Sequence, residues 1–130
     1  MRVLVVGDAC EDVYVYGYSH RLAPEAPAPV FLKSFERRNG GMALNVYNNL
    51  RSLGVRTDIL HNSEKIEKTR FVDEKTNHLF LRVDTDDKKV ARINSKYLTK
   101  KYLSKFDAVV ISDYNKGFLN EDHLSDIRKK

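Results

Sequence analysis

The chain has 130 residues, 32% charged residues and a formal net charge of +5, a composition typical of one globular domain. Cys10 is the only cysteine, which excludes an intrachain disulfide and a CxxC metal site. The histidines are scattered without metal-ligand spacing, so we expect no metal. The basic residues lack interleaved aromatic residues, so we expect no nucleic-acid binding. No apolar run approaches the ~20 residues that cross a bilayer, and no signal peptide is visible, so we expect a cytoplasmic protein.

The first third of the chain predicts one buried strand and two strands that have apolar residues on both faces. Residues 3–6 form a continuous apolar run, typical of a parallel sheet. Residues 13–18 and 30–35 are rich in β-branched and aromatic residues and predict two strands. The proline-rich segment 21–29 separates them. We expect this small sheet to cover a ligand or to pair with a second copy.

A helix is predicted over residues 42–53, directly after two adjacent glycines. Gly40 and Gly41 would let the backbone approach a ligand closely, because no Cβ intervenes. Gly54 follows the last helical residue and predicts its end. The helix N-terminus offers unpaired N–H groups to a polar or anionic ligand, and Asn45 lies one turn further on. An ordinary loop and helix start is the alternative interpretation.

The rest of the chain alternates strands and helices. Apolar and charge patterns predict a core strand at 57–60, a polar loop at 62–67, a hairpin of 69–72 and 79–83, a charged turn at 84–89, a basic amphipathic helix at 97–106, a buried strand at 108–111 and a last helix capped by Asn120.

This order of elements predicts an α/β sandwich with an added β flap. Ligands of open α/β sheets bind at the carboxyl ends of strands. We therefore expect three polar strand ends to gather at one edge: Asp8, a loop at 39–41 and Asp113. Asp8 and Asp12 could accept hydrogen bonds from sugar hydroxyls there. A turn aspartate and a solvated aspartate are the alternatives.

Four blocks, in the same order, resemble the N-terminal half of the PfkB/ribokinase family of sugar kinases. Within this family the likeness is to the heptose 7-phosphate kinases of ADP-heptose synthesis. The blocks are VVGDACEDVYVYG (5–17), HRLAPEAPAPVF (20–31), ERRNGGMALNVYNNLRSLG (36–54) and VVISDYNKGFL (109–119), with weaker echoes in KTRFV (68–72) and LRVD (81–84).

The resemblance implies a ribokinase-like partial α/β sandwich in a single truncated domain, 1–130, with lid strands near 13–18 and 30–35. It implies a sugar or sugar phosphate as the ligand and a homodimer through the lid strands. Lys116 lies near where a sugar phosphate would sit, and Arg70 and Arg82 lie in the weaker echoes. The implied substrate-binding residues are Asp8, Asp12, Gly40, Gly41, Asn45, Asp113 and Lys116; the catalytic residues stay unknown.

The sequence departs from the family pattern in three places. Met42 stands where the family has the second glycine of its signature, which would narrow the backbone approach to the sugar. Between Leu60 and Lys68 a short polar loop replaces a helix and a strand. The Gly-Ala-Gly-Asp catalytic motif and the ATP-binding half are absent from the 130 residues. We therefore expect ATP and Mg²⁺ to act only if a complementary C-terminal half is supplied.

Three interpretations stay open. The chain is one half of a split kinase with a separately encoded C-terminal partner, a non-catalytic sugar-binding or regulatory module, or a truncated product with little function. An exposed apolar edge after residues 109–111 would favour the first. A polar edge, or an edge buried in a homodimer, would favour the second. Poor solubility would favour the third.

Overall fold

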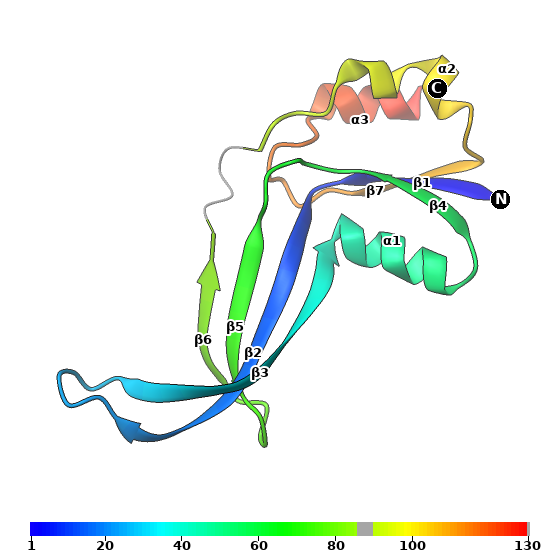
Figure 1. Cartoon of the computed structure of the whole chain (residues 1–130). Helices are drawn as coiled ribbons and strands as arrows, with labels where there is room; N and C mark the ends of the chain where they lie inside the picture. The colour runs from blue at the N-terminus through cyan, green and yellow to red at the C-terminus, as the bar shows by residue number, and fades with distance from the viewer. Residues whose placement is uncertain (86–89, 130) are drawn as a thin grey trace. The chain divides into compact units, whose positions relative to one another are not determined.

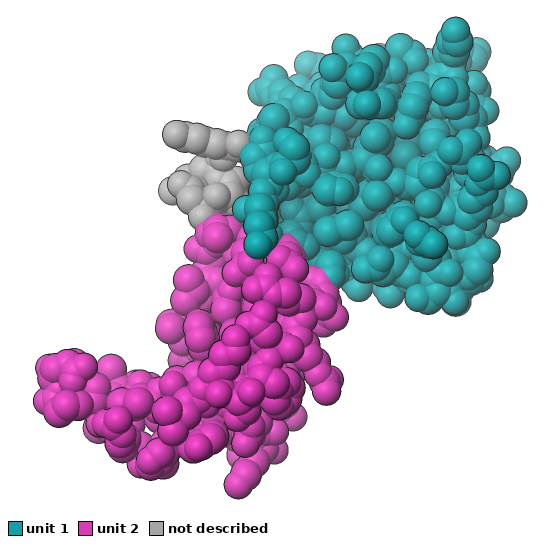
Figure 2. All heavy atoms as spheres, viewed as in Figure 1, with its two compact units in different colours: residues 1–10, 40–66, 86–130 teal, residues 11–39, 67–85 magenta. Residues whose placement is uncertain are grey.

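The computed structural model describes residues 1–85 and 90–129. Contacts within the chain divide it into two compact units, drawn teal and magenta in Figure 2. Unit 1 comprises residues 1–10, 40–66 and 86–130, and unit 2 comprises residues 11–39 and 67–85. The chain therefore passes between the units four times.

Unit 1 is built on a three-stranded parallel sheet in the order β4-β1-β7. The strands are β1 (Arg2–Gly7), β4 (Arg56–Leu60) and β7 (Ala108–Ser112). These confirm the predicted strands at 3–6, 57–60 and 108–111. The central strand β1 is a continuous apolar run because both faces of the sheet are covered; Leu4, Val5 and Val6 are fully buried.

Helices cover the two faces of this sheet, as Figure 1 shows. Helix α1 (Ala43–Ser52) packs on β1 and β4. The other face carries η1 (Ser95–Leu98), α2 (Lys100–Leu103) and α3 (Glu121–Arg128). Alternate residues of β1 point to opposite faces, so Leu4 and Val6 join the second layer in the main core. That core also contains Ile93, Leu98, Leu103, Phe118 and Leu119.

The basic helix predicted over 97–106 is wrong as a continuous element. Thr99 has an extended backbone, and its hydroxyl accepts a hydrogen bond from the Tyr102 N–H at 3.3 Å. A threonine with this geometry caps a new helix, so the segment divides into η1 and α2. Leu98 and Leu103 are buried, while Tyr102 and Phe106 are half-buried.

Unit 2 holds most of a four-stranded sheet in the order β3-β2-β5-β6. The predicted hairpin is confirmed, because β5 and β6 pair antiparallel, and β2 and β5 are parallel. Both lid strands are longer than predicted. The bounds are β2 (Ala9–Leu22), β3 (Pro29–Met42), β5 (Glu67–Asp73) and β6 (Leu79–Asp84).

Two predicted loops, at 39–41 and 84–89, are not simply confirmed. The loop expected at 39–41 is wrong, because β3 continues through Met42 to the first residue of α1. Pairing with β2 extends a strand that local glycine content alone would have ended. Of the charged turn predicted at 84–89, Asp84 lies in β6, and residues 86–89 lie outside the described residues.

Gly54 ends α1 as predicted. Its φ is +78°, and its N–H donates to the Arg51 carbonyl at 2.9 Å, while the Val55 N–H donates to the Leu50 carbonyl at 3.0 Å. These two bonds form a Schellman motif, which needs a left-handed residue at this position. No atom lies within 4 Å of a Cβ built on Gly54, so the requirement comes from the backbone alone.

We expect Gly54→Ala to lower the free energy of unfolding by about 1 kcal/mol, because alanine pays the cost of the left-handed backbone. Gly54→Asn should cost less, since asparagine tolerates this conformation. Urea unfolding of the three proteins measures both effects. An alanine variant as stable as the parent would contradict this account of the helix end.

Candidate functional site

The carboxylate of Asp8 is fully buried and holds the loop that follows β7. Its Oδ2 accepts hydrogen bonds from the backbone N–H groups of Tyr114 at 2.8 Å and Lys116 at 3.2 Å. Its Oδ1 accepts one from Phe118 at 3.3 Å. Backbone hydrogen bonds to a carboxylate are charge-assisted and stronger than neutral ones. Asp8 therefore fixes residues 113–119 against the end of β1.

The fixed loop presents polar groups to solvent. Asp113 is exposed, and its Oδ1 accepts a hydrogen bond from the Asn115 N–H at 2.8 Å. Asn115 and Gly117 both have positive φ, 56° and 109°, which makes the loop turn tightly. Asp113 lines an open pocket of about 520 Å³ together with Arg92, Asn115, Gly117, Leu119, Asn120, Glu121 and Leu124. The sequence did not predict Arg92 as a site residue.

Asp8 also connects this loop to the start of α1. The Ala43 N–H donates to the Asp8 backbone carbonyl at 2.9 Å. One residue thus joins the carboxyl end of β1, the loop that carries Asp113 and Lys116, and the N-terminus of α1. These are the strand ends that the sequence placed at one sheet edge. Asp12, the fourth expected member, belongs to unit 2.

Met42 and Gly40, next to the start of α1, are each constrained by their surroundings. Met42 has φ 54° and ψ −126°, in a region that glycine populates freely and other residues avoid. Its side chain is 6% exposed and packs with Cys10 and Ile66. The methionine therefore points into the core, and the departure from glycine acts through the backbone. A Cβ on Gly40 would lie 2.7 Å from the Leu44 Cβ, so glycine is needed there for space. Asn45 is exposed.

Sequence reasoning missed the buried Asn62. Its Oδ1 accepts from the Ala9 N–H at 2.7 Å, and its Nδ2 donates to the carbonyls of Ala9 at 3.2 Å and Glu64 at 2.8 Å. The amide thus satisfies the backbone beside Asp8 and fixes the loop after β4. Its only local signal was a position in a polar segment, which is the usual mark of a solvated side chain.

In unit 2, Asp12 forms an ion pair with Arg70, whose Nη1 lies 2.6 Å from the Asp12 Oδ1. The two side chains are 23% and 21% exposed, so water screens the pair only in part. The Arg70 guanidinium lies 5.1 Å from the centre of the Tyr14 ring, within the range of a cation–π contact. These contacts hold the guanidinium in one place.

Strand register gathers further charges around this pair. Asp12 lies opposite Lys68, and Lys68 lies opposite Asp84. Two positions further along each strand, Tyr14 lies opposite Arg70, and Arg70 lies opposite Arg82. Residues directly opposite each other, and those two positions along a strand, share a face. We call this surface the Arg70 face; it consists of Asp12, Tyr14, Lys68, Arg70, Arg82 and Asp84.

The Arg70 face has more basic than acidic groups. Arg82 donates to both carboxylate oxygens of Asp84 at 2.7 Å, and this hydrogen bonding holds the pKa of Asp84 below its usual value. Arg70 and Arg82 lie directly opposite each other, an arrangement of like charges that destabilises a sheet unless an anion offsets it. With Lys68, three cations face two carboxylates on this surface.

Within residues 1–85 and 90–129, no group of three histidine, cysteine, aspartate or glutamate side chains is placed to hold a metal ion. Over the same residues, no helix has the length and apolar character needed to span a membrane.

The strained backbone at Met42 leads to a prediction with an internal control. We expect Met42→Gly to be more stable than Met42→Ala by about 1–2 kcal/mol, because both lose the side chain but only glycine relieves the positive φ. Urea unfolding gives the difference directly. If the alanine variant were equally stable, the strain at this position would be disproved.

No protein-family model matches the chain. The chain is nevertheless 37% identical over 150 aligned residues to the bifunctional protein HldE of Helicobacter pylori strain 26695, and 28% identical over 152 to that of Sulfurimonas denitrificans. The alignments cover 92% and 93% of this chain but 32% of each relative. The chain therefore spans about a third of the length of these relatives. Because the aligned stretch is longer than the whole chain, HldE has residues there without a counterpart.

Solved structures give the fold. A carbohydrate kinase from Agrobacterium tumefaciens superposes with a TM-score of 0.54 at 14% identity, over 97% of this chain and 48% of its own. A putative phosphofructokinase from Staphylococcus aureus superposes with a TM-score of 0.59 at 9% identity, over 99% and 49%. The predicted resemblance is confirmed: the chain has the α/β fold of the ribokinase-like carbohydrate kinases and resembles HldE in sequence.

Proposed function

We propose that this chain is the sugar-binding part of a carbohydrate kinase and that its ligand is a phosphorylated sugar of the heptose phosphate type. The similarity to HldE over 92% of the chain supports the kinase assignment. The proposal includes a cytoplasmic location and a homodimer through the lid strands, both of which the sequence resemblance implies.

The observation that carries the proposal is the Asp12–Arg70 pair on a cationic face of the lid sheet. A carboxylate accepts hydrogen bonds from sugar hydroxyls, and a guanidinium matches phosphate oxygens in a bidentate arrangement. The fixed position of Arg70, between Asp12 and the Tyr14 ring, reduces the ordering cost of binding. In this proposal Asp12 binds a hydroxyl, while Arg70 and Arg82 bind the phosphate.

Unit 1 carries further residues that the family resemblance implies for sugar binding, and they are proposed separately from the unit 2 site. The backbone at Gly40 and Gly41, the exposed amide of Asn45 and the loop groups Asp113 and Lys116 are its candidates. Asp8 differs from these candidates, because its carboxylate is buried and accepts hydrogen bonds from three N–H groups of the loop. We propose that Asp8 positions the loop and does not touch the sugar.

Phosphoryl transfer also requires a base and stabilisation of the charge on the transferred group. The sequence has no GxxxxGK[ST] loop, and the proposal assigns no nucleotide or Mg²⁺ site to the described residues. No step through the nucleotide is derived for this chain. ATP and Mg²⁺ enter the proposal only with a complementary half.

The edge of the unit 1 sheet favours such a half. Strand β7 is the last strand of its sheet among the described residues, and Ile111 on it is 41% exposed. Beside it lies a groove of about 730 Å³, whose apolar lining is Leu103, Phe106, Ala108, Val109, Ile111, Leu124 and Ile127. Open strand edges with apolar residues are sites where further strands add. A non-catalytic sugar-binding or regulatory module is the alternative function.

We expect the chain to bind heptose 7-phosphate and Arg70→Met to weaken binding at least tenfold, because a charge-assisted hydrogen bond is worth about 1.5–3 kcal/mol. Calorimetric titration with the phosphorylated and the unphosphorylated sugar separates the phosphate contact from the hydroxyl contacts. Arg56→Met, which removes an exposed arginine from β4 in unit 1, is the matched control. Unchanged affinity in Arg70→Met would refute the proposed phosphate site.

A second prediction concerns the open edge. The chain alone should not phosphorylate the sugar, whereas addition of the HldE segment C-terminal to the aligned part should give kinase activity with Mg²⁺ and ATP. Ile111→Asp should abolish this complementation and leave sugar binding unchanged, because it places a charge on the edge. Sugar phosphorylation by the purified chain alone would overturn the split-kinase proposal and leave its fold intact.

A further inference from the structure

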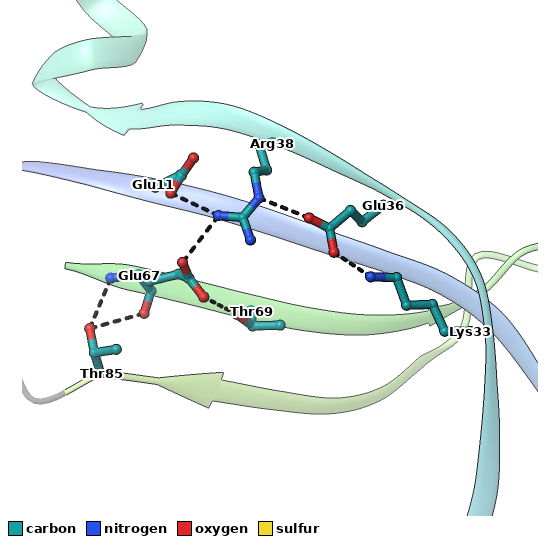
Figure 3. A network of polar contacts seen from close by, with 7 residues as sticks. All are labelled: Glu11, Lys33, Glu36, Arg38, Glu67, Thr69 and Thr85. Carbon is teal, nitrogen blue, oxygen red and sulfur yellow. Dashed lines mark hydrogen bonds and ion pairs between the residues drawn. The ribbon is translucent and has the colours of Figure 1, made fainter. Parts of the chain in front are cut away.

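A network of charged side chains joins three strands at one end of unit 2 (Figure 3). Arg38 of β3 is at its centre. Its Nη1 donates to Glu11 of β2 at 3.0 Å and to Glu67 of β5 at 3.2 Å, and its Nε donates to Glu36 at 2.9 Å. Lys33 donates to the other oxygen of Glu36. One guanidinium thus contacts three carboxylates, one on each of the strands β2, β3 and β5.

The network lies where the chain passes between the two units. Glu11 and Glu67 are the first residues of the two segments of unit 2, Thr85 is the last residue of the second segment, and Arg38 is one residue from the end of the first. The Glu67 N–H donates to the Thr85 hydroxyl at 2.8 Å, and the Thr85 N–H donates to the Glu67 carbonyl at 3.0 Å. All four crossings therefore have a residue of this network within two positions.

Arg38 offsets a repulsion that the strand register creates. Glu11 and Glu67 lie directly opposite each other in the parallel pairing of β2 and β5, and like charges in this position destabilise a sheet. Hydrogen bonds from Lys33 and then from Arg38 lower the pKa of Glu36, and the hydrogen bond to Glu36 raises the pKa of Arg38 further. The guanidinium of Arg38 is the cation that all three carboxylates share.

We propose that Arg38 is a positioning residue that fastens β2, β3 and β5 where the chain enters unit 2, so that this unit behaves as one body. The next row of the sheet holds Asp12 opposite Lys68, and two rows further along Tyr14 lies opposite Arg70. Fastening the first row therefore keeps the Arg70 face in register. This last consequence rests on the proposed function; the fastening itself does not.

An arginine is required at this position. Its planar fork reaches two acceptors with one nitrogen and a third with another, whereas a lysine ammonium is a single point charge. Removal of the guanidinium takes away the cation that Glu11 and Glu67 share. The resulting defect depends on pH, because protonation of the carboxylates ends the repulsion.

The test is amide hydrogen exchange of the full chain without sugar. We expect Arg38→Met to increase exchange at least tenfold in β2, β3 and β5 and to leave β1, β4 and β7 unchanged. Arg37→Met is the matched control: Arg37 is the neighbouring residue, and it contacts the rings of Tyr16 and Phe35. It should leave exchange in unit 2 near the parent value. Equal increases in both units, or none in unit 2, would overturn the proposal.

The pH profile separates an ionic fastening from simple loss of packing. The ionisable groups of the network are Glu11 from β2, Lys33 and Glu36 from β3, and Glu67 from β5. Because a lowered carboxylate pKa stabilises the fold only above its unfolded value, the difference in urea midpoint between parent and Arg38→Met should be largest near pH 7. It should shrink as the pH falls below ~4.5, through the lowered pKa of Glu36. A pH-independent difference would contradict the proposal.

Two further variants keep the test decisive if Arg38→Met folds poorly. Arg38→Lys should give an intermediate increase in exchange, and Glu67→Gln should partly rescue Arg38→Met by removing one of the opposed charges. Failure of both would overturn the proposal. Because these measurements need no ligand, they separate the fastening from the proposed sugar binding: the expected exchange result with unchanged sugar affinity in Arg70→Met would refute only the sugar site.

Discussion

The buried carboxylate of Asp8 is the contact on which the functional edge of unit 1 depends. It accepts three backbone hydrogen bonds from a loop more than one hundred residues later in the chain, and its carbonyl receives the first N–H of α1. A buried charge is costly unless it is fully hydrogen-bonded. The loop that satisfies Asp8 is therefore fixed in one conformation, and that conformation presents Asp113 to solvent. The hydrogen bonds that stabilise this part of the fold are therefore the same ones that hold the candidate site.

Unit 2 combines buried apolar residues, which include Val13, Val15 and Val72, with paired charges. Its strands place charged residues opposite one another on both faces of the sheet, with Glu11 opposite Glu67 on one face and Arg70 opposite Arg82 on the other. Each arrangement alone would be repulsive. The first is offset within the chain by Arg38. The second is offset by Asp12 and Asp84, and Lys68 leaves one more cation than carboxylates on the Arg70 face.

The proposed function rests on two separate tasks of a kinase. Holding an acceptor hydroxyl and stabilising a transferred phosphoryl group are separate tasks. Under the proposed function, the present residues would perform the first task, and a segment added at the open edge of β7 would perform the second. The aligned relatives are about three times as long as this chain, and the superposed kinases about twice.

The sequence by itself determined the strands of the parallel sheet, the hairpin, the ends of α1 and α3 and the resemblance to sugar kinases, because apolar runs, Gly54 and Asn120 act through their nearest neighbours. Only the tertiary structure decided that 39–42 continue a strand, that Thr99 divides a helix, that Asn62 and Asp8 are buried and that Met42 points into the core. These features arise from hydrogen bonds and packing between residues far apart in the chain, which leave no periodic trace in the local sequence.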